Sequence, residues 1–182
     1  MVQHRAVSGS QHRLPDRRRL QARAVFLLRG VHYCDYRMVV GIVGSEEAKF
    51  TPAGKERAID RIWHILARPD VTGVVSGACH LGGIDVWAAA QGKTLGIEVI
   101  EFPPKAHSWS NGYKPRNIQI AKTCDELWCI TVKKLPDEYN GMIFPGCYHC
   151  GTTDHVKSGG CWTMRYAKKL GKQTKLVVIE NS

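Results

Sequence analysis

The chain has 182 residues, of which 43% are hydrophobic, so it can fold as one domain around a sizeable core. No stretch approaches the roughly 20 continuous apolar residues of a membrane-spanning helix, so the sequence predicts no membrane partner. The formal charge of +10 suggests nucleic acid as a partner, but residues 1–37 hold eight arginines and two aspartates, which leaves only +4 for residues 38–182. Nucleic-acid binding is therefore open but not favoured.

Residues 1–37 form a basic leader without helical or strand periodicity, and it gives way at Met38 to the apolar run MVVGIVGS. Two interpretations remain open. The leader is a translated upstream region with Met38 as the true start, or it is a basic targeting or interaction arm. In both cases we expect it to be disordered and to take no part in the fold.

From Met38 onward, short apolar runs alternate with helical patterns. Thr51-Pro52 is typical of a helix start, with an N-cap followed by proline, and Gly171 is typical of the residue after a helix. The expected strands are Val39–Val43, Val71–Val75, Ile97–Phe102, Leu127–Val132 and Lys175–Ile179. The first expected helix begins at Thr51-Pro52, and the other three cover Ile84–Leu95, Arg116–Thr123 and Gly160–Leu170.

This order predicts an α/β fold: a Rossmann-like, doubly wound parallel sheet in one domain, residues 38–182. Residues 133–157 are polar and rich in glycine and cysteine, and form an insertion before the last helix. In such sheets ligands bind beyond the carboxyl ends of the strands, so the turns at those ends are where we expect the site.

Three of these turns contain glycine. Gly44-Ser45 follows the first strand; read alone, it is an ordinary tight turn. The second turn, SGACHLGGID from Ser76 to Asp85, and the third, SGGCWT from Ser158 to Thr163, both open helices, whose free N–H groups attract anions. Two such turns on neighbouring helices predict one shared anion site. Trp109, Tyr113 and Trp162 could stack on a base there, although core packing is the commoner role of such residues.

The second turn resembles the SGxxxGxD loop of the SLOG superfamily, which includes DprA (Smf), Lonely Guy phosphoribohydrolases and YspA-like nucleotide-binding proteins. Pro115-Arg116-Asn117, followed by Ile120-Ala121 and Asp125, is similar to the next marker, and SGGCWT is similar to the final phosphate loop. The resemblance covers roughly residues 38–180.

The resemblance implies the strand order 3-2-1-4-5 and a nucleotide or nucleotide derivative as ligand. Arg116 offers a charged fork for phosphate and Asn117 an amide for base or ribose. Asp85 holds a ribose hydroxyl, orients the loop, or is simply a favourable acid at a helix start. The expected ligand-binding residues are Gly44, Ser45, Ser76, Gly77, Gly82, Gly83, Asp85, Arg116, Asn117, Ser158, Gly159, Gly160 and Thr163.

Catalysis is a separate question. The Lonely Guy loop PGGxGTxxE contains a glutamate that takes part in N-glycosidic cleavage, and Tyr166 stands at that place here. Such cleavage normally needs a carboxylate, so we expect a binding protein. An N-glycosidase or ribosyl transferase is the first alternative, and a DprA-like nucleic-acid-binding module the second.

The cysteines suggest a metal site. Cys147, Cys150, His155 and Cys161 follow the pattern C-x2-C-x4-H-x5-C, close to a zinc knuckle, with His149 as an alternative ligand. The competing interpretation is free cytosolic thiols, because seven unevenly spaced cysteines do not suggest a disulfide framework. We expect a cytoplasmic protein, with structural zinc and a homo-oligomer both left open.

Overall fold

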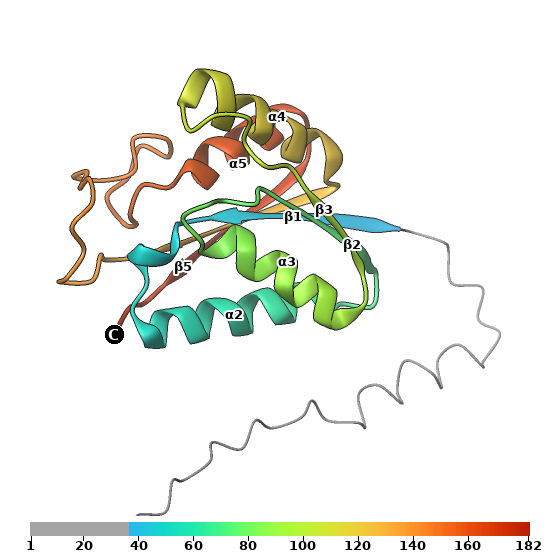
Figure 1. Ribbon diagram of the computed structural model, residues 1–182, viewed down its shortest axis with the longest axis horizontal. Coiled ribbons are helices and arrows are strands. Elements are labelled where there is room, and N and C mark those ends of the chain that lie inside the picture. The colour runs from blue at the N-terminus through green and yellow to red at the C-terminus, as the bar shows by residue number, and fades with distance from the viewer. Residues whose placement is uncertain (1–36) are drawn as a thin grey trace, which may run out of the picture. The chain divides into compact units, whose positions relative to one another are not determined.

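The computed structural model describes residues 37–182, so the predictions about the leader lie outside the described residues. These residues form one parallel sheet of five strands in the order β3-β2-β1-β4-β5, as predicted (Figure 1). The strands are β1 Met38–Gly44, β2 Val71–Ser76, β3 Glu98–Glu101, β4 Glu126–Val132 and β5 Gln173–Ile179.

Strand β1 lies in the middle and pairs with β2 on one side and β4 on the other. Val40 lies opposite Val74 of β2 and Glu126 of β4, and Gly41 is likewise paired with both neighbouring strands. The chain first builds β1, β2 and β3 in one direction and then crosses back to β4 and β5. The connectivity therefore reverses between β1 and β4, which is where such folds leave a crevice.

Helices cover both faces of the sheet: α2 and α3 lie on one face and α4 and α5 on the other (Figure 1). A 3-10 turn, η1, follows β1, and a π-helical turn, η2, leads directly into α4. The bounds are η1 Glu47–Lys49, α2 Pro52–Leu66, α3 Ile84–Leu95, η2 Trp109–Tyr113, α4 Lys114–Thr123 and α5 Gly159–Lys169.

The alternation of side chains along the central strands builds two separate cores. Val40 and Ile42 of β1 pack with Ile62 of α2 on one face, whereas Val43 packs with Ile120 of α4 on the other. All five side chains are at most 1% exposed. Burial on both faces explains why the strands are continuous apolar runs.

The predicted helix ends are confirmed. Thr51 caps α2 by accepting a hydrogen bond from the Gly54 amide, with Pro52 at the first helical position. Gly171 follows α5 with φ of +77°, the left-handed conformation that glycine adopts at low cost.

The segment between β4 and α5 contains no helix or strand, only an isolated bridge between Cys147 and Thr152. Its Tyr139 hydroxyl donates to Glu46, just after β1, and its Val156 amide donates to the Val132 carbonyl at the end of β4. The segment therefore lies at the carboxyl ends of these two strands. None of the helices within residues 37–182 has both the length and the apolar character needed to cross a membrane.

Candidate functional site: a cleft beside a cysteine–histidine cluster

A cleft of about 580 Å³ lies at the carboxyl end of β1, beside the reversal of connectivity. Its wall is formed by the end of β1, the turns before α3 and α5, the start of α4 and the insertion. The two glycine-rich turns, 76–85 and 158–163, therefore both reach this cleft, although more than 70 residues separate them in the chain.

Eight of the thirteen expected ligand-binding residues line the cleft. They come from the first turn, from the acidic start of α3, from α4 and from the start of α5: Gly44, Ser45, Asp85, Arg116, Asn117, Ser158, Gly159 and Gly160.

The other five are not among the residues that line it. The hydroxyl of Ser76 donates to the carbonyls of Ile42 and Asp85, and that of Thr163 donates to the carbonyl of Gly159. Gly82 and Gly83 adopt φ of +70° and +86°, and a Cβ at Gly83 would lie 2.4 Å from the Ser45 carbonyl. Gly77 lies against the Arg116–Asp85 pair. These residues shape the turn.

Arg116 and Asp85 form a buried ion pair beneath the cleft, with Nη2 and Oδ2 3.2 Å apart. Arg116 also donates from Nη1 to the Gly77 carbonyl at 2.8 Å and from Nε to Asn117 Oδ1 at 3.0 Å. Burial raises the pKa of Asp85, which Arg116 and the Gly44 amide partly oppose. Arg116 thus joins α4 to the turn before α3 through Gly77 and Asp85.

The turn before α3 also contains a non-glycine residue in the left-handed region, Ala78, with φ of +44°. This conformation costs an L-residue about 1–2 kcal/mol. Cys79 and Leu81, which follow it, line the cleft. The strained backbone therefore lies at the candidate site, where such strain is often concentrated.

The start of α5 forms the opposite wall. Ser158 is the N-cap, and its Oγ accepts from the Gly160 amide at 3.1 Å. Gly160 packs against the end of β1, since a Cβ there would lie 2.9 Å from the Gly44 nitrogen, whereas a Cβ at Gly159 would meet nothing within 4 Å. The N-terminal end of α5 therefore opens on the cleft, with its positive dipole.

Sequence reasoning missed three charged residues at the cleft: Glu46, Lys49 and Lys157. Lys49 is 9% exposed, and this burial lowers the pKa of its ammonium group. The Glu46 carboxylate, 3.6 Å from Lys49 Nζ, partly offsets this lowering. Glu46 also accepts from the Tyr139 hydroxyl at 2.9 Å. For Glu46, the sequence offered one indication of a place at the site: it directly follows Gly44-Ser45 at the end of the first strand.

The three aromatic residues singled out from the sequence all line the cleft. Trp109 and Trp162 meet edge to face with ring centroids 5.1 Å apart, and Tyr113 lies 5.6 Å from the Arg116 guanidinium. Trp109 and Tyr113 come from the π-helical turn, which the sequence pattern did not predict. The indole of Trp109 is 43% exposed, so a planar ligand could contact it.

Beside the cleft, Cys147, Cys150, His155 and Cys161 form a cluster that could hold a metal ion. Their ligand atoms all lie within 4.8 Å of one another. His155 is 1% exposed; its Nε2 lies 3.7 Å from Cys161 Sγ, and its Nδ1 lies 2.6 Å from the Asp154 carboxylate. A carboxylate on the second ring nitrogen is typical of metal-binding histidines.

His149, the alternative ligand, is not a member of this cluster and instead lines the cleft. Cys161 has its Sγ in the cluster, while the preceding Gly159 and Gly160 line the cleft. The metal cluster and the glycine turn thus use neighbouring residues without competing for the same atoms. Burial, together with the neighbouring thiols, raises the pKa of Cys150 to about 12, so a bound cation would have to displace its proton.

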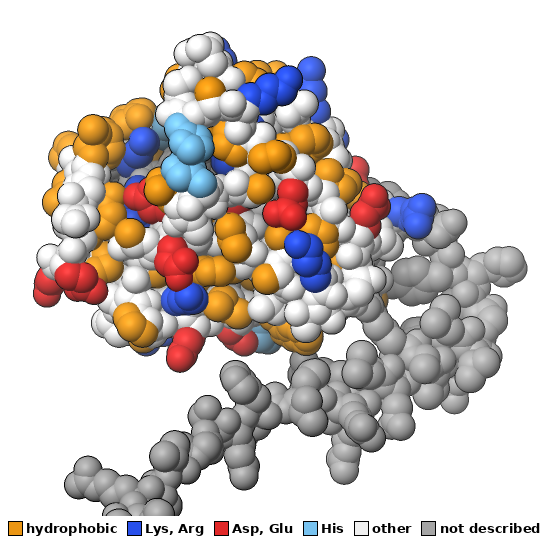
Figure 2. Space-filling model, in the orientation of Figure 1, with side chains coloured by type: hydrophobic (Ala, Val, Ile, Leu, Met, Phe, Trp, Pro, Cys, Tyr) orange, Lys and Arg blue, Asp and Glu red, His pale blue; other side chains and the backbone are white. Residues whose placement is uncertain are grey.

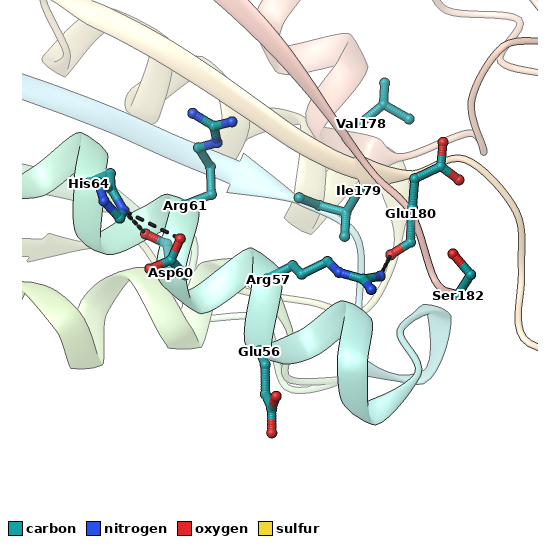
Figure 3. Close-up of a pocket in the computed structure, with 9 residues that line it drawn as sticks. All are labelled: Glu56, Arg57, Asp60, Arg61, His64, Val178, Ile179, Glu180 and Ser182. Atoms are coloured by element: carbon teal, nitrogen blue, oxygen red, sulfur yellow. Dashed lines mark hydrogen bonds and ion pairs between the residues drawn. The ribbon is translucent and has the colours of Figure 1, made fainter. Parts of the chain in front are cut away.

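A larger hollow of about 900 Å³ lies elsewhere, between α2 and β5 (Figure 3). Some of its polar groups already interact with one another: His64 Nδ1 is 3.4 Å from Asp60 Oδ2, and Arg57 donates to the Glu180 carbonyl. It contains no glycine turn, and it lies away from the reversal of connectivity. We therefore place the candidate site in the smaller cleft.

Comparison of the chain with models of protein families, with curated proteins and with solved structures found no match. The assignment of a function thus depends on the geometry of the cleft and of the cysteine–histidine cluster.

Proposed function

We propose that this chain binds a nucleotide or nucleotide derivative in the cleft, as its resemblance to the SLOG superfamily implies. One observation carries the proposal: two glycine-rich turns, far apart in sequence, both contribute to a single cleft at the reversal of the sheet. Its volume of about 580 Å³ lies within the range of small-molecule sites.

The chemistry of the wall suggests how such a ligand lies. The start of α5, with Lys49 and Lys157 nearby, suits a phosphate, and the aromatic residues Trp109 and Trp162 suit a base. The lining of the cleft contains three cationic side chains and two carboxylates. This small positive excess favours a ligand with one or two phosphates over a polyphosphate.

Binding to nucleic acid is less well supported. On the face drawn in Figure 2, lysine and arginine side chains lie scattered among acidic and apolar ones, without a continuous basic patch. A strand of nucleic acid needs an extended basic surface, whereas a small ligand needs only the cleft.

Isothermal titration of the full chain with ribonucleoside 5′-mono- and diphosphates tests the proposal. Lys157→Ala removes a cation from the cleft and should weaken binding about tenfold or more, the value of one charge-assisted contact. Lys93→Ala is the matched control, because Lys93 pairs with Glu101 away from the cleft. Absence of binding across the panel, or equal loss in both variants, contradicts the proposal.

A second candidate function, N-glycosidic cleavage, gains support from Glu46. It is the carboxylate at the cleft that is not paired with Arg116, and its side chain is 24% exposed. Hydrolysis would release free base, which chromatography detects, and Glu46→Gln should abolish that release while nucleotide still binds. Base release that survives Glu46→Gln would exclude this role.

We propose that the metal of the cysteine–histidine cluster is a structural zinc ion. Three thiolates and an imidazole are ligands that zinc prefers, and about 3.8 Å separates neighbouring ligand atoms around a tetrahedral zinc with bonds near 2.3 Å. The Cys161–His155 separation of 3.7 Å fits that geometry. The four protein ligands leave no open position for a substrate, which is typical of structural sites.

Metal analysis of the purified full chain tests this assignment. We expect one zinc per chain, lost in Cys150→Ser and retained in Cys124→Ala, a matched control because Cys124 is a buried cysteine outside the cluster. A zinc-free protein that does not take up added Zn²⁺ would contradict it.

A further inference from the structure

The four members of the metal cluster bracket residues of the cleft. Tyr148 and His149 lie between Cys147 and Cys150, and both line the cleft. Residues 157–160 lie between His155 and Cys161, and all four of them line the cleft. Each of these two wall segments thus lies between two members of the cluster.

The first segment belongs to a tight turn closed mainly on itself. The amides of Cys150 and Gly151 donate to the Cys147 carbonyl, and the Cys147 amide donates to the Thr152 carbonyl. It lies in the long connection without helix or strand, and the Tyr148 side chain is 60% exposed. Binding of its two cysteines to a metal ion would therefore add an attachment to the rest of the protein beyond the contacts of Tyr148 with Phe144 and Lys157.

The second segment is joined to the sheet at its start. The Val156 amide donates to the Val132 carbonyl, and Thr131 Oγ1 donates to the Val156 carbonyl at 2.8 Å. Thr131 also shares a hydrogen bond with Ser45, which lines the cleft. His155 therefore lies at the junction between the metal cluster, the end of β4 and the floor of the cleft.

We infer that a metal ion in this cluster orders one wall of the cleft and thereby increases its affinity for the nucleotide. The inference rests on the proposed function and adds a regulatory partner to the same site. The ion connects segments 147–150 and 155–161 and so orders them before the ligand binds. Ligand binding then costs less conformational entropy. By linkage, the ligand must then strengthen metal binding by the same factor.

The metal ion is expected to increase nucleotide affinity by ordering the cleft wall, not by electrostatic attraction between the metal site and the nucleotide. A divalent ion with three thiolates carries a net charge of −1, which by itself opposes an anionic ligand. We therefore expect the metal-dependent gain in affinity to persist in salt, where exposed charges are screened over roughly 8 Å.

The first experiment needs no nucleotide. Hydrogen–deuterium exchange is compared between the full chain loaded with Zn²⁺ and the same chain treated with a chelator. We expect slower exchange in the loaded chain at residues 148–151 and 157–161, with no change in β2. Equal exchange at these segments overturns the inference, and so does loss of protection throughout the sheet, because the metal would then support the whole fold.

The second experiment measures the coupling, with AMP and inorganic phosphate as probes. We expect AMP to bind the Zn²⁺-loaded chain about tenfold more tightly than the chelated chain, within the usual range of coupling between sites. Cys150→Ser should bind AMP like the chelated chain, and Cys124→Ala like the loaded chain. Equal AMP affinity with and without Zn²⁺ overturns the coupling.

The two proposals fail in different ways. If AMP and the other nucleotides do not bind the loaded chain, the proposed function is wrong, and the exchange experiment still decides whether the metal orders the wall. If AMP binds but the metal changes neither exchange nor affinity, the proposed function stands and the inference is wrong.

Discussion

At the scale of single residues, neighbouring glycines at the start of α5 have different roles. A Cβ at Gly160 would lie 2.9 Å from the Gly44 nitrogen and 3.0 Å from Cys129 Sγ, whereas a Cβ at Gly159 would meet nothing within 4 Å. Gly160 is therefore required by packing between α5 and β1. Gly159 is free to vary as far as the fold is concerned.

We predict that Gly160→Ala lowers the free energy of unfolding by about 1–3 kcal/mol, the usual cost of overpacking. Gly159→Ala should leave it unchanged or raise it by up to about 1 kcal/mol, because alanine favours the helix. Urea denaturation of the two variants measures the difference. Equal effects would mean that α5 does not approach β1 as closely as the structure has it.

Arg116 lines the cleft, as the sequence predicted, but it also has a structural role that the sequence did not indicate. The sequence assigned it to a phosphate, but its guanidinium group already contacts Asp85, Asn117 and the Gly77 carbonyl. Its removal would disturb the turn as well as any ligand contact, so it is a poor test of binding.

We predict that Arg116→Ala lowers the free energy of unfolding by about 3–5 kcal/mol at neutral pH, because it leaves the Asp85 carboxylate buried without its partner. Burial already raises the pKa of Asp85, and loss of Arg116 raises it further. Protonation then relieves the cost, so the loss should shrink as the pH falls. Chemical denaturation at pH 7 and pH 5 measures this, with Arg61→Ala on the exposed face of α2 as the control; a loss that grows in acid would contradict it.

At the scale of elements, Glu126 at the start of β4 joins three parts of the fold. Its carboxylate lies 2.7 Å from Arg68, just after α2, and 2.9 Å from Lys175 in β5. Burial opposes its ionisation, but the interactions with both cations outweigh burial and lower its pKa. The ionised form is therefore stabilised by folding.

A lowered carboxyl pKa contributes stability above the ordinary glutamate range, and this contribution is lost as the pH falls through the folded-state value. We predict that the wild type loses stability more steeply than Glu126→Gln between pH 6 and pH 3. The measurement is the urea midpoint across that range. Parallel pH profiles would show that Glu126 gains nothing from its partners in the folded state.

Most elements were predictable because local chemistry and tertiary contacts agree. The runs at Val39 and Val71 are apolar since both faces of those strands are buried, and Thr51-Pro52 sets the start of α2. Two elements have weaker sequence patterns than the buried strands. They are the π-helical turn at Trp109–Tyr113 and the edge strand β3, which is half exposed and only four residues long. Turn η1, which positions Lys49, is shorter still, with three residues.

At the scale of the whole molecule, the topology decides what the turns can do. Reversal between β1 and β4 brings residues 76–85 and 158–163 to one cleft, an arrangement that the glycine pattern and the resemblance predicted together. The sequence could not show which glycines serve packing, as Gly83 does, because that depends on the approach of Ser45. It also could not show that Glu46 and Lys157 share the cleft, since no local pattern joins them.

The most direct test of the nucleotide site is a crystal structure of the Zn²⁺-loaded full chain grown with AMP. We predict that the phosphate lies within hydrogen-bond distance of the backbone amides at the start of α5 and that the base lies against Trp109 or Trp162. AMP bound in the groove between α2 and β5, or a cleft that stays empty at millimolar AMP, would contradict it.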